Sequence, residues 1–95
     1  MMDAIPLPDI TGDGSPHPLS LTPILAKWVQ YQADPNNPDM GGASVRIGLN
    51  ASVTLGYPMF KGSFQMFPPS GELYDLSKLS YYAATGAKLS VLYGS

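Results

Sequence analysis

The sequence predicts an all-β fold, an antiparallel β-sandwich or jelly-roll-like arrangement in a single domain. Short segments in which apolar and polar residues alternate recur at roughly the 8–12-residue spacing typical of such sheets. Ten glycines and ten prolines lie between these segments, where they mark turns rather than a disordered tract. No window shows the apolar period of a helix. At 95 residues the chain makes one domain with one thin core.

The clearest pattern is the last third of the chain, residues 74–93, which predicts a β-hairpin. Apolar side chains alternate with others on both halves, at Leu79, Tyr81 and Ala83 and then at Leu89, Val91 and Tyr93. A three-residue loop ending at Gly86, with that glycine in the left-handed conformation, places the apolar residues of both halves on the same face of the hairpin. It places Tyr81 opposite Leu89. Tyr82 then faces Lys88 on the outer side of the hairpin.

The first eight residues, 1–8, are expected to form an extended arm ahead of a sandwich domain of residues 9–95. Two prolines within the arm cannot donate hydrogen bonds to a sheet, which confines it to a sheet edge or to the surface of another molecule. After a turn at 12–15, the segment 16–20 is expected to return antiparallel to this first segment.

The middle of the chain predicts further strands, at 27–33, 44–49, 51–55 and 63–67. The first of these is the strongest, with Val29, Tyr31 and Ala33 on one face. An exposed, mobile loop is expected at 34–42, because this stretch contains two prolines, a glycine pair and several Asp and Asn residues. An aromatic-rich turn is expected at 56–62.

Composition limits the classes of partner. Five basic residues are scattered singly among seven acidic ones, so no basic stripe is available for phosphates and no nucleic-acid partner is expected. No run approaches the ~20 apolar residues of a membrane span, and no secretion signal is visible. Only 13% of residues are charged, against a typical ~25%, which suggests that partners cover part of the surface.

Residues able to support chemistry are few, and each is expected to be structural. His17 is the only histidine and lies between two prolines, so it is expected to be a turn residue rather than a base or metal ligand. Acidic residues of the 12–15 turn and the 34–42 loop are expected to serve turns rather than a cation. Glu72 is expected to be solvated, and Asp75 to accept hydrogen bonds within its own turn. No enzyme activity, metal or cofactor is therefore expected.

Three aromatic residues are candidates for a contact surface. Tyr82 faces outward from the predicted hairpin, and Tyr57 and Phe60 lie in the 56–62 turn. Aromatic side chains contribute much buried area at interfaces. Core packing is the alternative for all three, and the sequence leaves both interpretations open.

The order of several short stretches carries a resemblance that covers nearly the whole chain. The stretches are residues 10–15, 17, 19–20, 27–30, 45–48, 67–69, 74–77 and 86–94. In this order they resemble the short structural proteins encoded among the head genes of tailed bacteriophages, and among these the capsid decoration, or cement, proteins. The 34–42 loop and the proline-rich segment 5–8 depart from that pattern, which affects the details of the docking surface.

The resemblance implies a small β-sandwich, a homotrimer, on the outer surface of the capsid in the virion, where it clamps subunits of the major capsid protein. The arm, with Ile5 and Leu7, would then reach onto a neighbouring subunit or the shell. Tyr57, Phe60 and Tyr82 would add contacts from the body. The alternatives are a phage tail, baseplate or head-to-tail component, a domain of a host-binding fibre, or a glycan-binding β-sandwich module.

Overall fold

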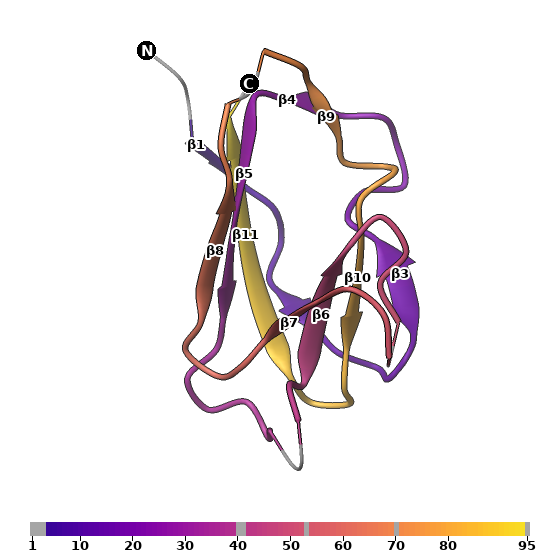
Figure 1. The fold of residues 1–95 in the computed structure, drawn as a ribbon, viewed down its shortest axis with the longest axis vertical. Helices are drawn as coiled ribbons and strands as arrows, with labels where there is room; N and C mark the ends of the chain where they lie inside the picture. Colours follow the sequence, from indigo (N-terminus) through magenta and orange to yellow (C-terminus); the bar gives the residue numbers. More distant parts are fainter. Residues whose placement is uncertain (1–3, 40–41, 53, 70, 95) are drawn as a thin grey trace.

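The alternating segments of the chain form two antiparallel sheets with one hydrophobic core between them (Figure 1). The structure is a computed structural model and describes residues 4–39, 42–52, 54–69 and 71–94. These residues contain no helix, and so none long and apolar enough to cross a membrane. The predicted all-β, antiparallel sandwich fold is confirmed.

The first sheet is built around β11, the longest strand, and has the order β1-β11-β5-β8 with β2 also paired to β11. Its five strands are β1 (Ala4–Pro6), β2 (Ile10–Thr11), β5 (Trp28–Ala33), β8 (Phe64–Phe67) and β11 (Lys88–Gly94). The predicted strands at 27–33 and 63–67 are therefore confirmed. Val29, Tyr31 and Ala33 of β5 are buried, as their alternation predicted.

The second sheet has four strands in the order β3-β10-β6-β7. These strands are β3 (Pro16–Pro18), β6 (Val45–Gly48), β7 (Tyr57–Met59) and β10 (Ser80–Ala83). A third, two-stranded pair, β4 (Leu25–Ala26) with β9 (Tyr74–Asp75), lies at one end of the sandwich (Figure 1). Strand β6 confirms the prediction for 44–49, except that Leu49 lies outside the strand and is exposed.

The core fills the space between the two sheets. Its largest fully buried side chains are Val29, Tyr31, Leu89 and Val91 from the first sheet, Val45, Ile47 and Met59 from the second, and Leu76 from the turn after β9. Apolar side chains from both sheets are therefore buried in one core, and this hydrophobic burial stabilises the face-to-face packing of the two sheets.

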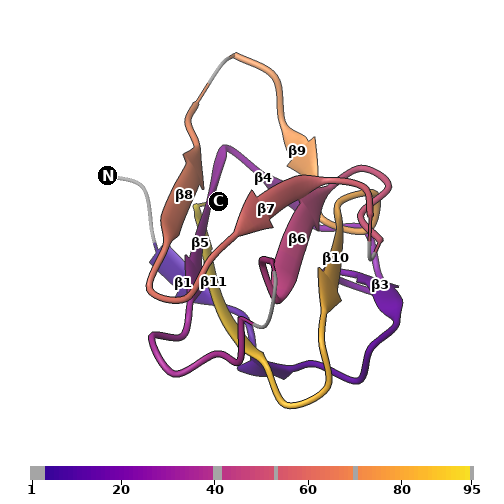
Figure 2. The same ribbon diagram turned by 60° about the horizontal axis from the view of Figure 1, so that its bottom comes forward.

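The last third of the chain does not form the predicted hairpin. β10 pairs with β3 and β6 in the second sheet, whereas β11 pairs with β1, β2 and β5 in the first. The turn between them crosses from one sheet to the other (Figure 2). It is closed by a hydrogen bond from the Ala87 amide to the Ala84 carbonyl (2.9 Å), and Gly86 adopts the expected positive φ, 86°.

The pairings across the predicted hairpin are replaced by pairings within the second sheet. Tyr81 lies opposite His17 and Ile47 instead of Leu89, and Tyr82 lies opposite Arg46 instead of Lys88. Alternation had identified the buried face of each strand correctly. It does not specify the neighbouring strand, because two strands with buried alternate residues can face each other across a core as well as pair side by side.

The N-terminal segment is an edge strand of the first sheet over the residues that the structure describes. Ile5 lies opposite Tyr93, and the Leu7 amide donates to the Val91 carbonyl (2.9 Å). Residues 4–7 therefore do not form an arm ahead of the sandwich as expected, although their placement at a sheet edge agrees with the prolines. The expected return of 16–20 against this segment is also wrong, because β3 pairs with β10.

Residues 40 and 41 of the predicted 34–42 loop lie outside the described residues, and residues 34–39 are fastened to the body at two points rather than free. The Asn37 side chain donates to the Lys88 carbonyl (2.9 Å) and accepts from the Lys88 amide (2.7 Å), as a strand residue would. Asp39 accepts hydrogen bonds from the Ser44 amide (3.1 Å), the Ser44 hydroxyl (2.6 Å) and the Lys61 amide (2.6 Å). Two predictions nearby are also corrected: the described residues of 51–55 form a turn rather than a strand, and Tyr57–Met59 is strand β7 within the predicted turn.

Candidate interaction site

Large apolar side chains are exposed along β7, β8 and the turn between them. The exposed fractions are 53% for Tyr57, 51% for Phe60, 56% for Phe64 and 37% for Met66. The Ser63 amide donates to the Phe60 carbonyl (2.9 Å), which closes the turn. β7 and β8 are edge strands of the two sheets, and the turn that carries Phe60 connects them (Figure 1). We call these four exposed residues the β7–β8 apolar side.

The register of β8 explains why two of these side chains face solvent. Phe64 lies opposite Gln32 and Met66 opposite Gln30 on β5. Residues directly opposite on antiparallel strands share a face, and the other residues of β5 point into the core. Phe64 and Met66 therefore project from the outer face of the first sheet. Large apolar groups gathered in this way are typical of a contact surface.

The five residues predicted to contact partners are placed differently from one another. Tyr57 and Phe60 are exposed, the first on β7 and the second in the turn that follows it. Tyr82 is half-buried in the second sheet. Ile5 is half-buried in β1, and Leu7 packs against the core. The structure thus exposes the two residues of the predicted turn and leaves the arm residues within the body.

Sequence reasoning did not single out Phe64 and Met66. The 63–67 segment has apolar residues on both of its faces. Phe67 lies on the same face as Gln65 and packs edge-on against Tyr31 at 5.2 Å between ring centroids. Phe64 and Met66 lie on the other face. The only available signal was the absence of proline and charge in this strand. That signal identifies an unprotected edge but does not say which face is buried.

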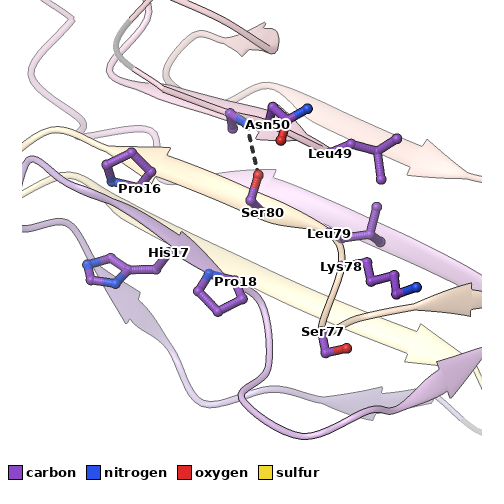
Figure 3. Close-up of a pocket in the computed structure, with 10 residues that line it drawn as sticks. Pro16, His17, Pro18, Leu49, Asn50, Ser77, Lys78, Leu79 and Ser80 are labelled. Carbon is purple, nitrogen blue, oxygen red and sulfur yellow. Dashed lines mark hydrogen bonds between the residues drawn. The ribbon is translucent and has the colours of Figure 1, made fainter.

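An open depression of about 380 Å³ lies against β3 and the beginning of β10 (Figure 3). It is lined by Pro16, His17, Pro18, Leu49, Asn50, Ala51, Ser77, Lys78, Leu79 and Ser80. The Ser80 hydroxyl donates to the Gly48 carbonyl (3.0 Å) and accepts from the Ala51 amide (2.8 Å), so its hydrogen bonds join β10 to β6 and the segment after it. In Figure 3 the His17 ring points away from the Ser77 and Ser80 hydroxyls. These residues do not form a paired nucleophile and base.

His17 lies in β3 and not in a turn as predicted. Its Nε2 is 2.8 Å from Oδ2 of Asp13, and its ring lies 5.8 Å from that of Tyr81 between centroids. Asp13 also accepts a hydrogen bond from the Ser15 amide (2.9 Å). The hydrogen bond with His17 is the main cause that holds the pKa of Asp13 below its ordinary value. This exposed pair fastens the 12–15 turn to β3.

Two further carboxylates, those of Asp34 and Asp75, also serve turns. Asp34 accepts from the Asn36 amide (2.8 Å), and Asp75 accepts from the amide and hydroxyl of Ser77 (3.0 and 2.7 Å). The Ser77 hydroxyl is the main cause that holds the pKa of Asp75 below its ordinary value. The prediction that Asp75 is a local turn acceptor is confirmed. Within the described part of the chain, no three His, Cys, Asp or Glu side chains come together as a metal site requires.

Comparison with protein families, with curated proteins and with solved structures found no match to this chain. The resemblance to phage decoration proteins therefore stays a prediction. The structure is a β-sandwich with a packed core and exposed apolar side chains on the β7–β8 apolar side. Such an arrangement is suited to holding another surface.

Proposed function

We propose that the protein is a virion structural protein, a capsid decoration (cement) protein. It binds subunits of the major capsid protein as an oligomer and stabilises the phage head from its outer surface. The observation that carries the proposal is the β7–β8 apolar side, in a chain of which only 13% is charged. Exposed aromatic side chains of this kind supply much of the binding energy when an interface buries them.

The body behind this surface supports the proposal because it is held in one arrangement. Residues of both sheets share the core, and Asn37 and Asp39 fasten the longest loop that the structure describes to β11, β6 and the turn before β8. A surface that is already ordered loses little conformational entropy on binding, so more of its contact energy remains as affinity. Many weak contacts on a repetitive shell then add through multivalency.

The proposed contact runs through the body and not through the arm. Residues 4–7 hydrogen-bond to β11, and Leu7 packs against the core, so this segment is already used within the molecule. Removing residues 1–8 would take a strand from the first sheet. Such a deletion would affect folding as well as binding, and point substitutions on the β7–β8 apolar side make the sharper test.

The test uses purified phage capsids that lack the protein, mixed with the protein and sedimented. We expect Phe60→Ser to weaken binding by about tenfold or more, because truncating a buried aromatic anchor typically costs ~2 kcal/mol or more. Leu21→Ser is the matched control, since Leu21 is 93% exposed and lies outside the β7–β8 apolar side. Equal binding by both variants, or an equal loss in both, would contradict the proposed surface.

A further inference from the structure

The edge strands of the two sheets differ in whether they can accept another strand. Along an antiparallel strand the hydrogen bonds alternate, so every second residue of an edge strand turns its N–H and C=O away from the sheet. A proline at such a position has no N–H to offer, and natural proteins use edge prolines to prevent unwanted pairing.

Two edge strands are closed by prolines in this way. In β1 the Leu7 amide donates to the Val91 carbonyl, so the residues that turn away from the sheet are Ala4, at the end of the strand, and Pro6. In β3 the Leu19 amide donates to the Leu79 carbonyl (2.9 Å), so the residues that turn away are the two prolines that flank His17.

The third edge, β7, is closed as well. The Ala84 amide donates to the Ser44 carbonyl (2.8 Å), which by alternation directs the backbone groups of Arg46 towards β10. Pro58 lies directly opposite Arg46 on β7 and therefore turns away from the sheet. β2, which also borders the first sheet, is only two residues long.

Strand β8 is the exception among the described edges of the two main sheets. The Ala33 amide donates to the Ser63 carbonyl (2.9 Å), so Gln65 turns its backbone towards β5, and Phe64 and Met66 turn theirs away. Both residues keep an N–H and a C=O for a further strand. Their side chains belong to the β7–β8 apolar side, so hydrogen-bonding groups and apolar surface coincide here.

We propose that β8 pairs antiparallel with β8 of a second copy of the chain, across a two-fold axis at Gln65. In this register Phe64 exchanges both backbone hydrogen bonds with the partner subunit's Met66, and Met66 does the same with the partner subunit's Phe64. The five-stranded sheets of the two copies then form one continuous sheet.

A second copy fits this edge because β8 is complementary to itself. The two-fold axis sets each Phe64 ring against a Met66 thioether on the outer face, and sulfur–aromatic contacts are favourable. Residues 63–67 carry no charge, so the symmetric pairing brings no like charges together. The register places Gln65 opposite the partner subunit's Gln65, where two amides can hydrogen-bond to each other.

This inference goes beyond the proposed function and does not depend on capsid binding. It predicts a two-fold pair, whereas the resemblance to decoration proteins implies a trimer. The strand contact is short, so the pair is expected to dissociate on dilution.

The first test measures the mass of the purified protein by light scattering over roughly 10 μM to 1 mM, the range in which weak interfaces dissociate. We expect the mass to rise from 10.1 kDa towards twice that value. Met66→Pro removes an outward N–H without touching the β5 ladder and is expected to stay at 10.1 kDa. Met66→Lys tests the same edge without proline, and Met66→Leu is the control that should associate like the wild type.

The second test uses the absence of cysteine from the chain. At the proposed axis the two copies of residue 65 form a pair without backbone hydrogen bonds, with Cα atoms about 4.5 Å apart, within the range that a disulfide spans. Gln65→Cys is therefore expected to form a disulfide-linked dimer under mild oxidation. Gln32→Cys is the control, because Gln32 is exposed and lies on the neighbouring inner strand. It should form no disulfide-linked dimer.

A concentration-dependent dimer that Met66→Pro and Met66→Lys abolish, with cross-linking at residue 65 alone, is the expected result. A monomer at every concentration would overturn the inference, and so would three times the monomer mass. A dimer unaffected by both Met66 variants and not cross-linked at residue 65 would also overturn it.

Discussion

Tyr31 is the largest fully buried side chain in the structure, and its hydroxyl has no hydrogen-bond partner within the described residues. Burial raises the pKa of this hydroxyl, so it stays protonated across the physiological range. A buried polar atom that loses water and gains no partner lowers stability. The ring itself packs well, edge-on against Phe67.

Tyr31→Phe is therefore expected to raise the free energy of unfolding by about 1–3 kcal/mol, because it removes an unsatisfied hydroxyl and keeps the ring. Chemical denaturation of the two proteins side by side measures the difference. Tyr82→Phe, at a half-buried outer position, is the control and should change stability little. A loss of stability in Tyr31→Phe would show that the hydroxyl has a partner.

The Asp39 carboxylate, in the loop after β5, is expected to make the stability of the protein depend on pH. Partial burial acts to raise the pKa of its carboxyl, but hydrogen bonds from the Ser44 hydroxyl, the Lys61 amide and the Ser44 amide outweigh this and hold the pKa below the usual 3.8. With the folded pKa below the unfolded one, the ionised form stabilises the fold above pH 3.8, and this contribution is lost as the pH falls through the folded pKa.

Stability should accordingly fall between roughly pH 5 and pH 2, with Asp13 and Asp75, whose pKa values are also lowered, adding to the slope. Asp39→Asn is expected to be less stable near pH 7 and to show a shallower pH dependence. Ser44→Ala keeps the carboxylate but removes one donor. Its stability and its pH dependence should lie between those of the wild type and those of Asp39→Asn. Urea denaturation at a series of pH values measures these slopes, and an unchanged slope in Asp39→Asn would contradict this assignment.

Single residues also mark the limit of prediction from the sequence. The composition of the 34–42 loop correctly indicates turns, but Asn37 pairs with Lys88, far along the chain, as a strand residue would. No local pattern distinguishes an Asn that serves its own turn from one that bonds to a distant backbone. Asp75 was predictable because its partner, Ser77, is two residues away.

At the scale of elements, alternation identified strands and their buried faces but not their neighbours. Leu79, Tyr81 and Ala83 in and before β10, like alternate residues of β11, lie in or pack against the core, which suits a hairpin and equally suits two strands that face each other across the core. The structure uses the second arrangement, and the 12–15 turn supports it. The Gly12 amide donates to the Ala87 carbonyl (2.7 Å), and the Gly86 amide donates to the Gly12 carbonyl (3.1 Å).

Gly12 sits so close to this crossing that a Cβ would collide with the backbone oxygen atoms of Ala83 and Ala84. Gly12→Ala is therefore expected to destabilise the protein by several kcal/mol, because backbone must move to make room. Gly42→Ala is the matched control, since a Cβ there meets nothing within 4 Å. Thermal unfolding compares the two, and similar melting temperatures would contradict the close packing at the crossing.

At the scale of the whole molecule, the predicted all-β fold class is confirmed, and two residues that the sequence identified as candidates for contact, Tyr57 and Phe60, are exposed. The exposure of Phe64 and Met66 could not be predicted, because it depends on β8 being an edge strand and on its register with β5. The described residues of the predicted arm form a strand because they pair with β11. The proposed contact through the body, rather than through an arm, rests on this arrangement.

The most direct test of this account counts the copies of the protein bound to capsids that lack it, at saturation, by quantitative gel analysis of the sedimented particles. A decoration protein repeats with the capsid lattice, so we expect on the order of hundreds of copies per particle, with binding lost in Phe60→Ser. No binding, or about a dozen copies per particle, would contradict a role on the shell. The latter result would place the protein in the tail or at the head-to-tail junction instead.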